Sequence, residues 1–220
     1  MRTRTAFLVL LTAGVVGTAA WLVFFSPVLG VRSVEIVGNL TVPTERIKQQ
    51  AGVEELHPLA TVDLADVQSR VMLIRQLASA KVDRVWPGTL KIEVVEREAV
   101  AAVIAGGKAA LIDGQGVVIE IKDVAPARLP VLKVDRPGAG DPATMAALKV
   151  IGNLPPALTG RVRAVQATSP EGVSLRLTDG RTIVWGGTDR GADKARILAS
   201  LLTRKADVYD VSSPDVVTLK

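Results

Sequence analysis

The sequence contains no cysteine and only one histidine, His57. The lack of cysteine excludes a disulfide framework, a zinc site with cysteine ligands and a cysteine nucleophile. A Ser-His-Asp triad or a histidine-ligated metal site would have to use His57. Aromatic residues make up 3% of the chain, too few for the rows of stacking rings that single-strand nucleic-acid binders use. The 220 residues, 48% of them hydrophobic, suffice for one or two packed domains.

Positive charge is in slight excess and is not clustered. The chain has 27 Lys and Arg against 22 Asp and Glu, which gives a formal net charge of +5. Arg2 and Arg4 supply two of these charges, and basic runs do not exceed pairs such as Arg204-Lys205. An unclustered excess of this size is typical of a solvated surface, so a nucleic-acid partner is not expected.

Residues 6–25, from Ala6 to Phe25, contain no charged side chain. As a helix they are about 30 Å long, which matches the hydrocarbon core of a bilayer. Trp21, Phe24 and Phe25 stand at the far end, where an aromatic belt is expected. The alternative is a cleaved signal peptide with a small-residue site at Thr18-Ala19-Ala20. The apolar run continues past that site, which favours an uncleaved transmembrane helix.

The basic residues before this segment predict its orientation. Arg2 and Arg4 precede it, and Arg32 alone follows closely. The positive-inside rule then places residues 1–5 in the cytoplasm and residues 26–220 outside. An extracytoplasmic body has no ready supply of ATP or NAD(P)H, which disfavours kinases, ATPases and dehydrogenases.

In residues 26–98 the hydrophobic periodicity and the turn residues predict the order strand, helix, helix, strand, strand. The first strand lies at 31–37 and ends at Gly38-Asn39; the first helix spans 43–50, and the second is capped by Asp63 and continues through Ile74. The last two strands, 80–86 and 89–96, flank a Pro87-Gly88 turn. Trp86 is expected to cover the core where these two strands turn.

Residues 99–220 predict a β-rich region with two or so helices. Glycine-rich turns separate strands at 100–104, 109–112 and 117–121, and a short strand is expected at 129–134. A helix at 144–152 is expected to stop before Pro155-Pro156. Strands at 161–168, 172–177 and 182–185, a helix at 192–204 and a last strand at 208–212 complete the pattern.

A glycine-rich segment at 186–191, GGTDRG, has the glycine spacing of a phosphate loop. Ala192-Asp193 stands where that loop requires a Lys-Ser/Thr pair, so the cation and the magnesium ligand are missing. A strand-to-helix turn capped by Thr188 or Asp189 explains the segment better.

Other residues with catalytic side chains also have structural explanations. The chain has no Ser followed three residues later by Lys, the pattern of penicillin-interacting enzymes, and His57 is expected in a loop before Pro58. Asp113 fits an Asx turn. A charged solvent face is expected of Lys91, Glu93, Glu96, Arg97 and Glu98. We therefore expect no enzyme activity, no cofactor, no metal and no small-molecule substrate.

Several segments together resemble the FtsQ/DivIB family of bacterial cell-division proteins. Residues 85–97, VWPGTLKIEVVER, carry the most specific likeness. Further likenesses lie at residues 34–39, Ile47, 51–53, 58–59, 62–63, 111–118, 129–130, Gly187, Lys194 and 210–214. The resemblance covers nearly the whole chain, although its C-terminal matches are individually weaker.

The resemblance implies an α+β chain with four parts: a cytoplasmic tail at 1–5, a transmembrane helix at 6–25, a POTRA (polypeptide-transport-associated) domain at 26–98 and a β domain at 99–220. It implies a bitopic scaffold of the divisome at the septum of the bacterial cell membrane. The implied partners are single-span proteins of the FtsB/DivIC and FtsL types, other divisome components that bind the POTRA domain, and the lipid bilayer. Many family members have a longer cytoplasmic tail, so contacts inside the cell are not expected here. The alternatives are another POTRA-bearing assembly or secretion protein and a membrane-anchored cell-wall enzyme.

The last strand and the tail after it are predicted to bind a partner. A strand near a chain end often lies at a sheet edge, where its free backbone groups can pair with an added strand. Tyr209 is the only tyrosine, a residue type enriched at interface hot spots. The resemblance implies the same segment for an FtsB-like partner. The alternative is an ordinary closing strand with a frayed tail. The predicted contact residues are Arg196, Val208, Tyr209, Asp210, Val211, Ser212, Ser213, Asp215, Val216 and Val217, with Lys194, Arg204 and Lys205 as flanking charges.

Overall fold

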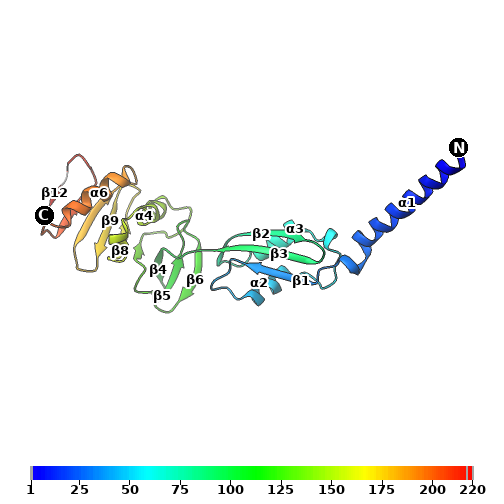
Figure 1. Ribbon diagram of the computed structural model, residues 1–220. Helices are drawn as coiled ribbons and strands as arrows, with labels where there is room; N and C mark the ends of the chain where they lie inside the picture. Colours follow the sequence, from blue (N-terminus) through cyan, green and yellow to red (C-terminus); the bar gives the residue numbers. More distant parts are fainter. Residues whose placement is uncertain (1, 217, 220) are drawn as a thin grey trace. The chain divides into compact units, whose positions relative to one another are not determined.

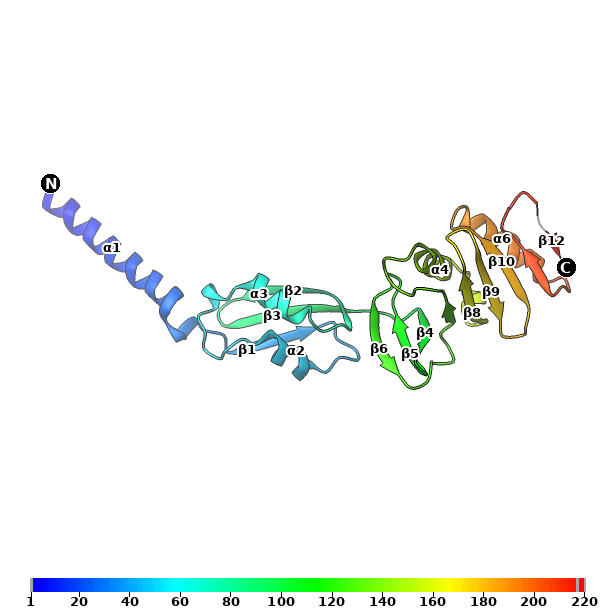
Figure 2. The same cartoon turned by 180° about the vertical axis from the view of Figure 1, so that it is seen from behind.

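The computed structural model describes residues 2–216 and 218–219. Backbone contacts separate the chain into two units, Met1–Arg97 and Glu98–Lys220. Figure 1 and Figure 2 show their elements from opposite sides. The predicted α+β class with an N-terminal apolar helix is confirmed.

Unit 1 starts with the helix α1 (Arg2–Phe25), followed by the short 3₁₀ turn η1 (Pro27–Leu29). Within α1, Arg4–Phe25 is long and apolar enough to cross a membrane, and its most apolar window is not buried by the rest of the chain. A helix that is apolar on all sides and lacks protein cover is typical of a lipid-facing segment.

The rest of unit 1 is a three-stranded sheet covered by two helices on one face. β3 is the central strand, parallel to β1 and antiparallel to β2. The predicted order of elements is confirmed: β1 (Ser33–Val37), α2 (Thr44–Ala51), η2 (Leu59–Thr61), α3 (Leu64–Val71), β2 (Leu77–Val85) and β3 (Thr89–Glu96).

Buried and more exposed side chains alternate along β3, and the buried ones form the centre of the core of unit 1. Leu90, Ile92 and Val94 point to the same face and are buried with Ile47 of α2 and Val67 of α3. Asp63 caps α3, as predicted, by accepting hydrogen bonds from the N–H groups of Ala65 and Asp66 at 3.0 and 3.1 Å. The helix ends at Val71, so Ile74 reaches the core from the following turn.

The prediction that Trp86 covers this core is wrong, because its side chain is 50% exposed. The eight residues of α3 span about 12 Å. The nine residues of β2 span about 30 Å. The helix layer is therefore much shorter than the strands. Near the β2–β3 turn, where the helices no longer cover the sheet, Arg84 of β2 lies over this face. Its guanidinium donates to the carbonyls of Leu59 and Val62 at 2.8 and 2.6 Å.

Unit 2 is built on one mixed sheet, which has nine strands within the described residues, in the order β12-β11-β10-β9-β8-β7-β4-β5-β6. The helix α4 lies against β8 and β9, and the largest buried side chains include Trp185 and Tyr209. The elements are β4 (Ala101–Ala105), β5 (Lys108–Ile112), β6 (Val118–Lys122), β7 (Val131–Lys133), α4 (Pro142–Gly152), α5 (Pro156–Thr159), β8 (Val162–Ala167), β9 (Val173–Leu177), β10 (Thr182–Gly186), α6 (Gly191–Leu201), β11 (Val208–Asp210) and β12 (Thr218–Leu219).

Most predicted strands of unit 2 match within two residues, and the differences lie at element ends. The helix predicted to stop before Pro155-Pro156 does so, at Gly152. Pro156 then opens the short helix α5, which was not predicted, because proline is tolerated in a first helical turn. The helix predicted to end at Arg204 ends at Leu201. The last predicted strand covers 208–210 rather than 208–212, and β12 was not predicted.

Glu96, predicted to lie on a solvent-facing charged surface, instead holds the loop after β1. Its carboxylate accepts hydrogen bonds from the N–H groups of Leu40 at 2.7 Å, Thr41 at 2.9 and 3.1 Å and Val42 at 2.8 Å, and from the Thr41 hydroxyl. Partial burial alone would raise the pKa of this carboxyl. The hydrogen bonds from the Thr41 hydroxyl and from the three N–H groups outweigh burial and lower the pKa to about 2.

We expect Glu96→Gln to destabilise unit 1 at pH 7 by about 1–3 kcal/mol, because hydrogen bonds to the charged form are lost. The folded pKa is depressed, so the wild-type advantage is complete above about pH 4.5 and disappears as pH falls towards about 2. Urea-dependent hydrogen–deuterium exchange of β3 peptides measures this difference for unit 1 alone. The exposed Glu55→Gln variant is the control; equal effects of both variants at pH 7 would contradict the assigned role.

Candidate functional site

The predicted partner segment starts with β11, which lies inside the sheet rather than at its edge. β11 pairs in parallel with β10, with Ile183 opposite Tyr209, and antiparallel with β12, with Leu219 opposite Tyr209. The outermost strand on this side, within the described residues, is therefore β12. The prediction of an edge strand at 208–212 is wrong in this respect, because the tail folds back and takes the edge position.

Tyr209 is fully buried. Its hydroxyl donates to the carbonyl oxygen of Arg204 at 2.6 Å and accepts from Nη1 of Arg181 at 3.0 Å. The Arg181 guanidinium carbon also lies 5.5 Å from the ring centroid, a cation–π distance. Tyr209 thus joins β11 to the segment that follows α6 and to the turn that precedes β10. A direct contact of its side chain with a partner, as predicted, does not fit this burial.

Arg181 is held in turn by Asp179 in the turn between β9 and β10. Its Nη2 and Nε lie 2.8 and 2.9 Å from Oδ2 of Asp179. Hydrogen bonding from Arg181 lowers the pKa of Asp179 to about 2, against the opposing effect of burial. The same pairing raises the pKa of Arg181 further above its ordinary value. The pair remains charged at all physiological pH values and fixes the guanidinium that faces Tyr209.

The exposed part of the predicted site is the loop 212–216. It begins with an Asx turn in which Asp210 Oδ1 accepts from the N–H and hydroxyl of Ser212 at 3.0 and 2.7 Å. It is tied to the start of α6 by Asp215, which pairs with Arg190 at 2.8 and 3.2 Å. Between these ties Ser213 is exposed, and Val216 is 71% exposed. Val217 lies outside the described residues.

Contacts at Gly186 and at Val211 hold this loop against the sheet. Gly186 has φ +75°, and a Cβ there would lie 2.8 Å from the Cβ of Ser212. The N–H of Val211 donates to the carbonyl of Val184 at 2.9 Å, and the Val211 side chain is buried. Of the predicted contact residues, Val211 therefore belongs to the core, whereas Val208 and Asp210 are half-buried.

The cations predicted to flank the site have different environments. Arg196 is exposed and pairs with Asp193 one turn earlier on α6. Lys194, in contrast, is fully buried, and its Nζ donates to the carbonyl of Gly187 at 3.0 Å and to Oδ1 of Asp189 at 3.3 Å. Lys194 therefore cannot supply a flanking surface charge.

Lys194 also explains the glycine-rich loop between β10 and α6. Its ammonium fills the loop from inside, and its hydrogen bond lowers the pKa of Asp189. The predicted cap at Thr188 or Asp189 is wrong, because the N-cap is Arg190, in the left-handed region, without a side-chain cap. The Asp189 carboxylate pairs with Lys194 instead of the helix N–H groups.

Asp113 and His57, which carry side chains common in catalysis, make local hydrogen bonds. Asp113 forms the predicted Asx turn by accepting from the N–H groups of Gln115 and Val117 at 2.9 and 2.8 Å. His57 is exposed, with Nε2 3.1 Å from the Thr61 hydroxyl. In the part of the chain that the structure describes, no three His, Asp or Glu side chains are grouped so that they could hold a metal ion.

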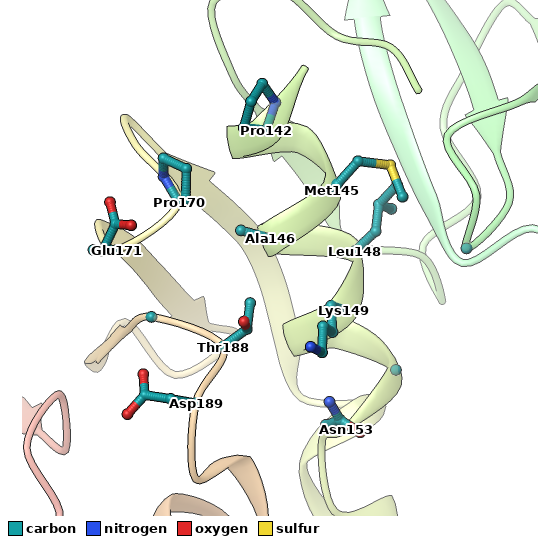
Figure 3. Close-up of a pocket in the computed structure, with 13 residues that line it drawn as sticks. Pro142, Met145, Ala146, Leu148, Lys149, Asn153, Pro170, Glu171, Thr188 and Asp189 are labelled. Carbon is teal, nitrogen blue, oxygen red and sulfur yellow. The ribbon is translucent and has the colours of Figure 1, made fainter. Parts of the chain in front are cut away.

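An open cleft of about 960 Å³, which sequence reasoning did not find, lies between α4, the β8–β9 turn and the β10–α6 loop. Figure 3 shows Met145 and Lys149 of α4 on one side, with Glu171 and Asp189 across the cleft on the two loops. No sequence signal marks it, because its lining comes from four segments that are well separated along the chain, Gly114 in the β5–β6 turn among them.

Comparison with known families identifies both units. Residues 29–97 match the model of the FtsQ-type POTRA domain, and residues 101–216 match that of the C-terminal domain of cell division protein FtsQ/DivIB. The chain belongs to the FtsQ/DivIB family. The predicted resemblance is confirmed.

Two mycobacterial relatives support this assignment. Cell division protein FtsQ of Mycolicibacterium smegmatis is 43% identical over 199 residues, which are 90% of this chain and 60% of that protein. FtsQ of Mycobacterium tuberculosis strain H37Rv is 39% identical over 100% of this chain and 70% of its own length. A solved extracytoplasmic domain of DivIB from Geobacillus stearothermophilus aligns with 50% of this chain and 98% of its own, at 20% identity and a TM-score of 0.37. The chain thus spans about 60–70% of the length of these mycobacterial relatives.

The FtsQ/DivIB C-terminal model extends to residue 216. It therefore includes β11 and the exposed loop 212–216 and excludes β12. That residues in this segment bind a partner stays a prediction. The assignment of Tyr209 to the contact does not fit its burial, because residue type alone does not distinguish an interface from a core.

We expect Tyr209→Phe to destabilise unit 2 by about 1–3 kcal/mol, because the Arg204 carbonyl and the Arg181 guanidinium lose a buried partner while the ring remains. The change should appear as faster hydrogen–deuterium exchange in β10 and β11 and not in β4 or β5. Exchange in β11 that equals wild type would show that the hydroxyl does not hold this strand.

Proposed function

We propose that this chain is a bitopic, non-enzymatic membrane scaffold of the bacterial divisome. Membership of the FtsQ/DivIB family, together with an unburied apolar helix at α1, carries this proposal. The scaffold would link early division proteins to the septal peptidoglycan synthesis machinery through extracytoplasmic contacts. The FtsQ-type match of the POTRA domain favours this role over outer-membrane assembly or secretion.

The anchor would be α1, with Arg2 and Arg4 on the cytoplasmic side and residues 26–220 outside. Trp21, Phe24 and Phe25 stand at the far end of the helix and are exposed, as interfacial aromatic residues are. The body would then act in a compartment without nucleotide cofactors, which is consistent with a role through protein contacts. The location would be the cell membrane at the septum.

The partners would be FtsB/DivIC-like and FtsL-like single-span proteins at the C-terminal domain, and other divisome components at the POTRA domain. For the first group we propose docking at the exposed loop 212–216, with strand addition along the outer side of β12. The exposed loop 212–216 and the outer side of β12 offer backbone and side-chain groups to an added strand. Ser213, Asp215 and Val216 would contact the partner, whereas Tyr209 and Val211 would hold the segment in place.

The topology is tested by two reporters fused after Lys220 of the full chain. A reporter active only outside the cytoplasm should be active, and one active only in the cytoplasm should be inactive, because Arg2 and Arg4 retain the N-terminus inside. A fluorescent fusion should concentrate at midcell before constriction. The opposite reporter pattern in a stable, membrane-bound fusion would reverse the orientation, and uniform membrane fluorescence would contradict the septal role.

The docking segment is tested by Val216→Asp in the full chain, reconstituted in nanodiscs. A buried charge at the contact should weaken binding of the extracytoplasmic segment of an FtsB/DivIC-like protein by roughly tenfold or more, mainly through faster dissociation. Val124→Asp is the matched control, since Val124 is 77% exposed in the loop after β6. Kinetics on an immobilised partner segment measure both variants.

Equal affinities of Val216→Asp and Val124→Asp, with both chains folded, would move the docking site away from this loop. Truncation after Asp207 is a poorer test, because it also removes the buried side chains of Tyr209 and Val211. Loss of binding would then report unfolding of β10 and β11 as readily as loss of a contact.

A further inference from the structure

The turn between β2 and β3 exposes a tryptophan that the fold does not cover. Trp86 is 50% exposed and its neighbour Val85 is 43% exposed. Two other large apolar side chains, Leu56 before η2 and Val28 in η1, are 53% and 56% exposed. These four residues, here named the apolar tip, belong to three segments that are distant in sequence.

Backbone hydrogen bonds tie all three segments to the residues that follow α1. The N–H groups of Arg32 and Ser33 donate to the carbonyl of Gly88 at 2.8 and 3.3 Å, which fixes the Trp86 turn on one side. On the other side, Val31 N–H donates to the His57 carbonyl at 2.9 Å, and Leu56 N–H donates to the Val31 carbonyl at 2.8 Å.

Close backbone contacts at two glycines make this junction rigid. A Cβ on Gly30 would lie 2.4 Å from the Leu56 carbonyl oxygen, and one on Gly88 would lie 2.9 Å from the Gly30 carbonyl oxygen. Side chains larger than glycine would therefore separate the segments. The apolar tip is held at the chain's exit from α1 by contacts that leave little freedom.

The path from α1 to this junction is short. Phe25, the last residue of α1, is five residues from Gly30, a reach of at most about 18 Å. The η1 turn shortens it further, since Gly30 N–H donates to the Pro27 carbonyl at 3.0 Å. If α1 spans the bilayer, the apolar tip therefore lies close to the interface where the helix leaves it.

The backbone of Leu56 is in an unfavourable conformation. Its φ is +63°, a left-handed conformation that is unfavourable for leucine, and the side chain it presents is exposed and apolar. Such strain is retained when the surrounding structure imposes it and is often found at functional sites. Here it is imposed by the Gly30 contact and directs an apolar residue outward beside the exit of α1.

We propose that the apolar tip inserts into the headgroup–acyl boundary of the leaflet at which α1 ends, with Trp86 as the principal anchor. Tryptophan is the side chain most typical of this region, because its ring is apolar and its indole N–H remains hydrated. The contact gives the POTRA domain a second attachment to the bilayer and limits its rotation about α1. The occupant is the lipid surface, and the inference rests on the membrane anchoring proposed above.

The neighbouring charges indicate what drives this contact. Glu54 and Glu55 precede Leu56, and Arg32 lies in the same junction, all exposed. Because charges of both signs surround the apolar tip, insertion should depend on apolar side chains and not on anionic lipid. Bilayers of phosphatidylcholine are therefore a sufficient probe.

The lack of cysteine makes a depth measurement straightforward. Single cysteines are introduced into the full chain, reconstituted in phosphatidylcholine liposomes, and labelled with a nitroxide. Val85→Cys reports the apolar tip with Trp86 retained, and Leu11→Cys reports α1. Leu40→Cys is the matched control, an exposed apolar residue beside Glu96 at the other end of β3.

Collisions of each nitroxide with oxygen and with a water-soluble nickel chelate give its depth. We expect the oxygen-to-nickel ratio at Val85→Cys to exceed that at Leu40→Cys by roughly threefold, as for an interfacial site. Adding Trp86→Ser to Val85→Cys should return the ratio to the Leu40→Cys value, because the principal anchor is gone.

The outcomes separate this inference from the proposed anchoring. A lipid-like ratio at Leu11→Cys with equal ratios at Val85→Cys and Leu40→Cys would overturn the insertion and leave the anchor intact. A high ratio at Val85→Cys that Trp86→Ser does not change would overturn the role of Trp86. Free access of the nickel chelate to Leu11→Cys would overturn the anchoring, and the insertion with it.

Discussion

The buried hydroxyl of Tyr209 is the interaction on which the C-terminal region depends. It joins β11 to the carbonyl of Arg204, which follows α6, and to Arg181, which precedes β10, and Asp179 holds that arginine in place. Unpaired polar groups at this depth would be costly, so the three segments are stable only together. The exposed loop 212–216 thereby leaves a fixed strand, and a partner that binds there would meet a preformed surface.

The two ends of the unit 1 sheet are closed in different ways. At one end the Glu96 carboxylate satisfies the N–H groups of a loop that has no helix or strand to pair with. At the other end backbone hydrogen bonds join the β2–β3 turn to the residues after α1. One end is closed by a polar contact within the domain, and the other joins the domain to the residues that follow α1.

Lys194 is buried and Trp86 is exposed, whereas lysine side chains are usually exposed and tryptophan side chains usually buried. Lys194 is stable inside because a carbonyl and a carboxylate surround its ammonium. Trp86 is exposed because the helices of unit 1 end before the turn that carries it. Neither case has a local sequence signal, since both depend on how far another segment extends.

Sequence patterns were sufficient to predict the apolar helix, the order of elements in unit 1, the Asp63 cap and most strands of unit 2, because these depend on periodicity and on contacts within a few residues. The sequence also contained the motifs of the FtsQ/DivIB family and directed attention to residues 208–217. Four features became visible only in the fold. β12 takes the sheet edge, Tyr209 and Lys194 are buried, Glu96 holds a loop more than fifty residues earlier, and Trp86 is exposed beside the exit of α1. Each of these depends on long-range pairing and packing, in which the partner of a side chain is set by the fold and not by its neighbours in sequence.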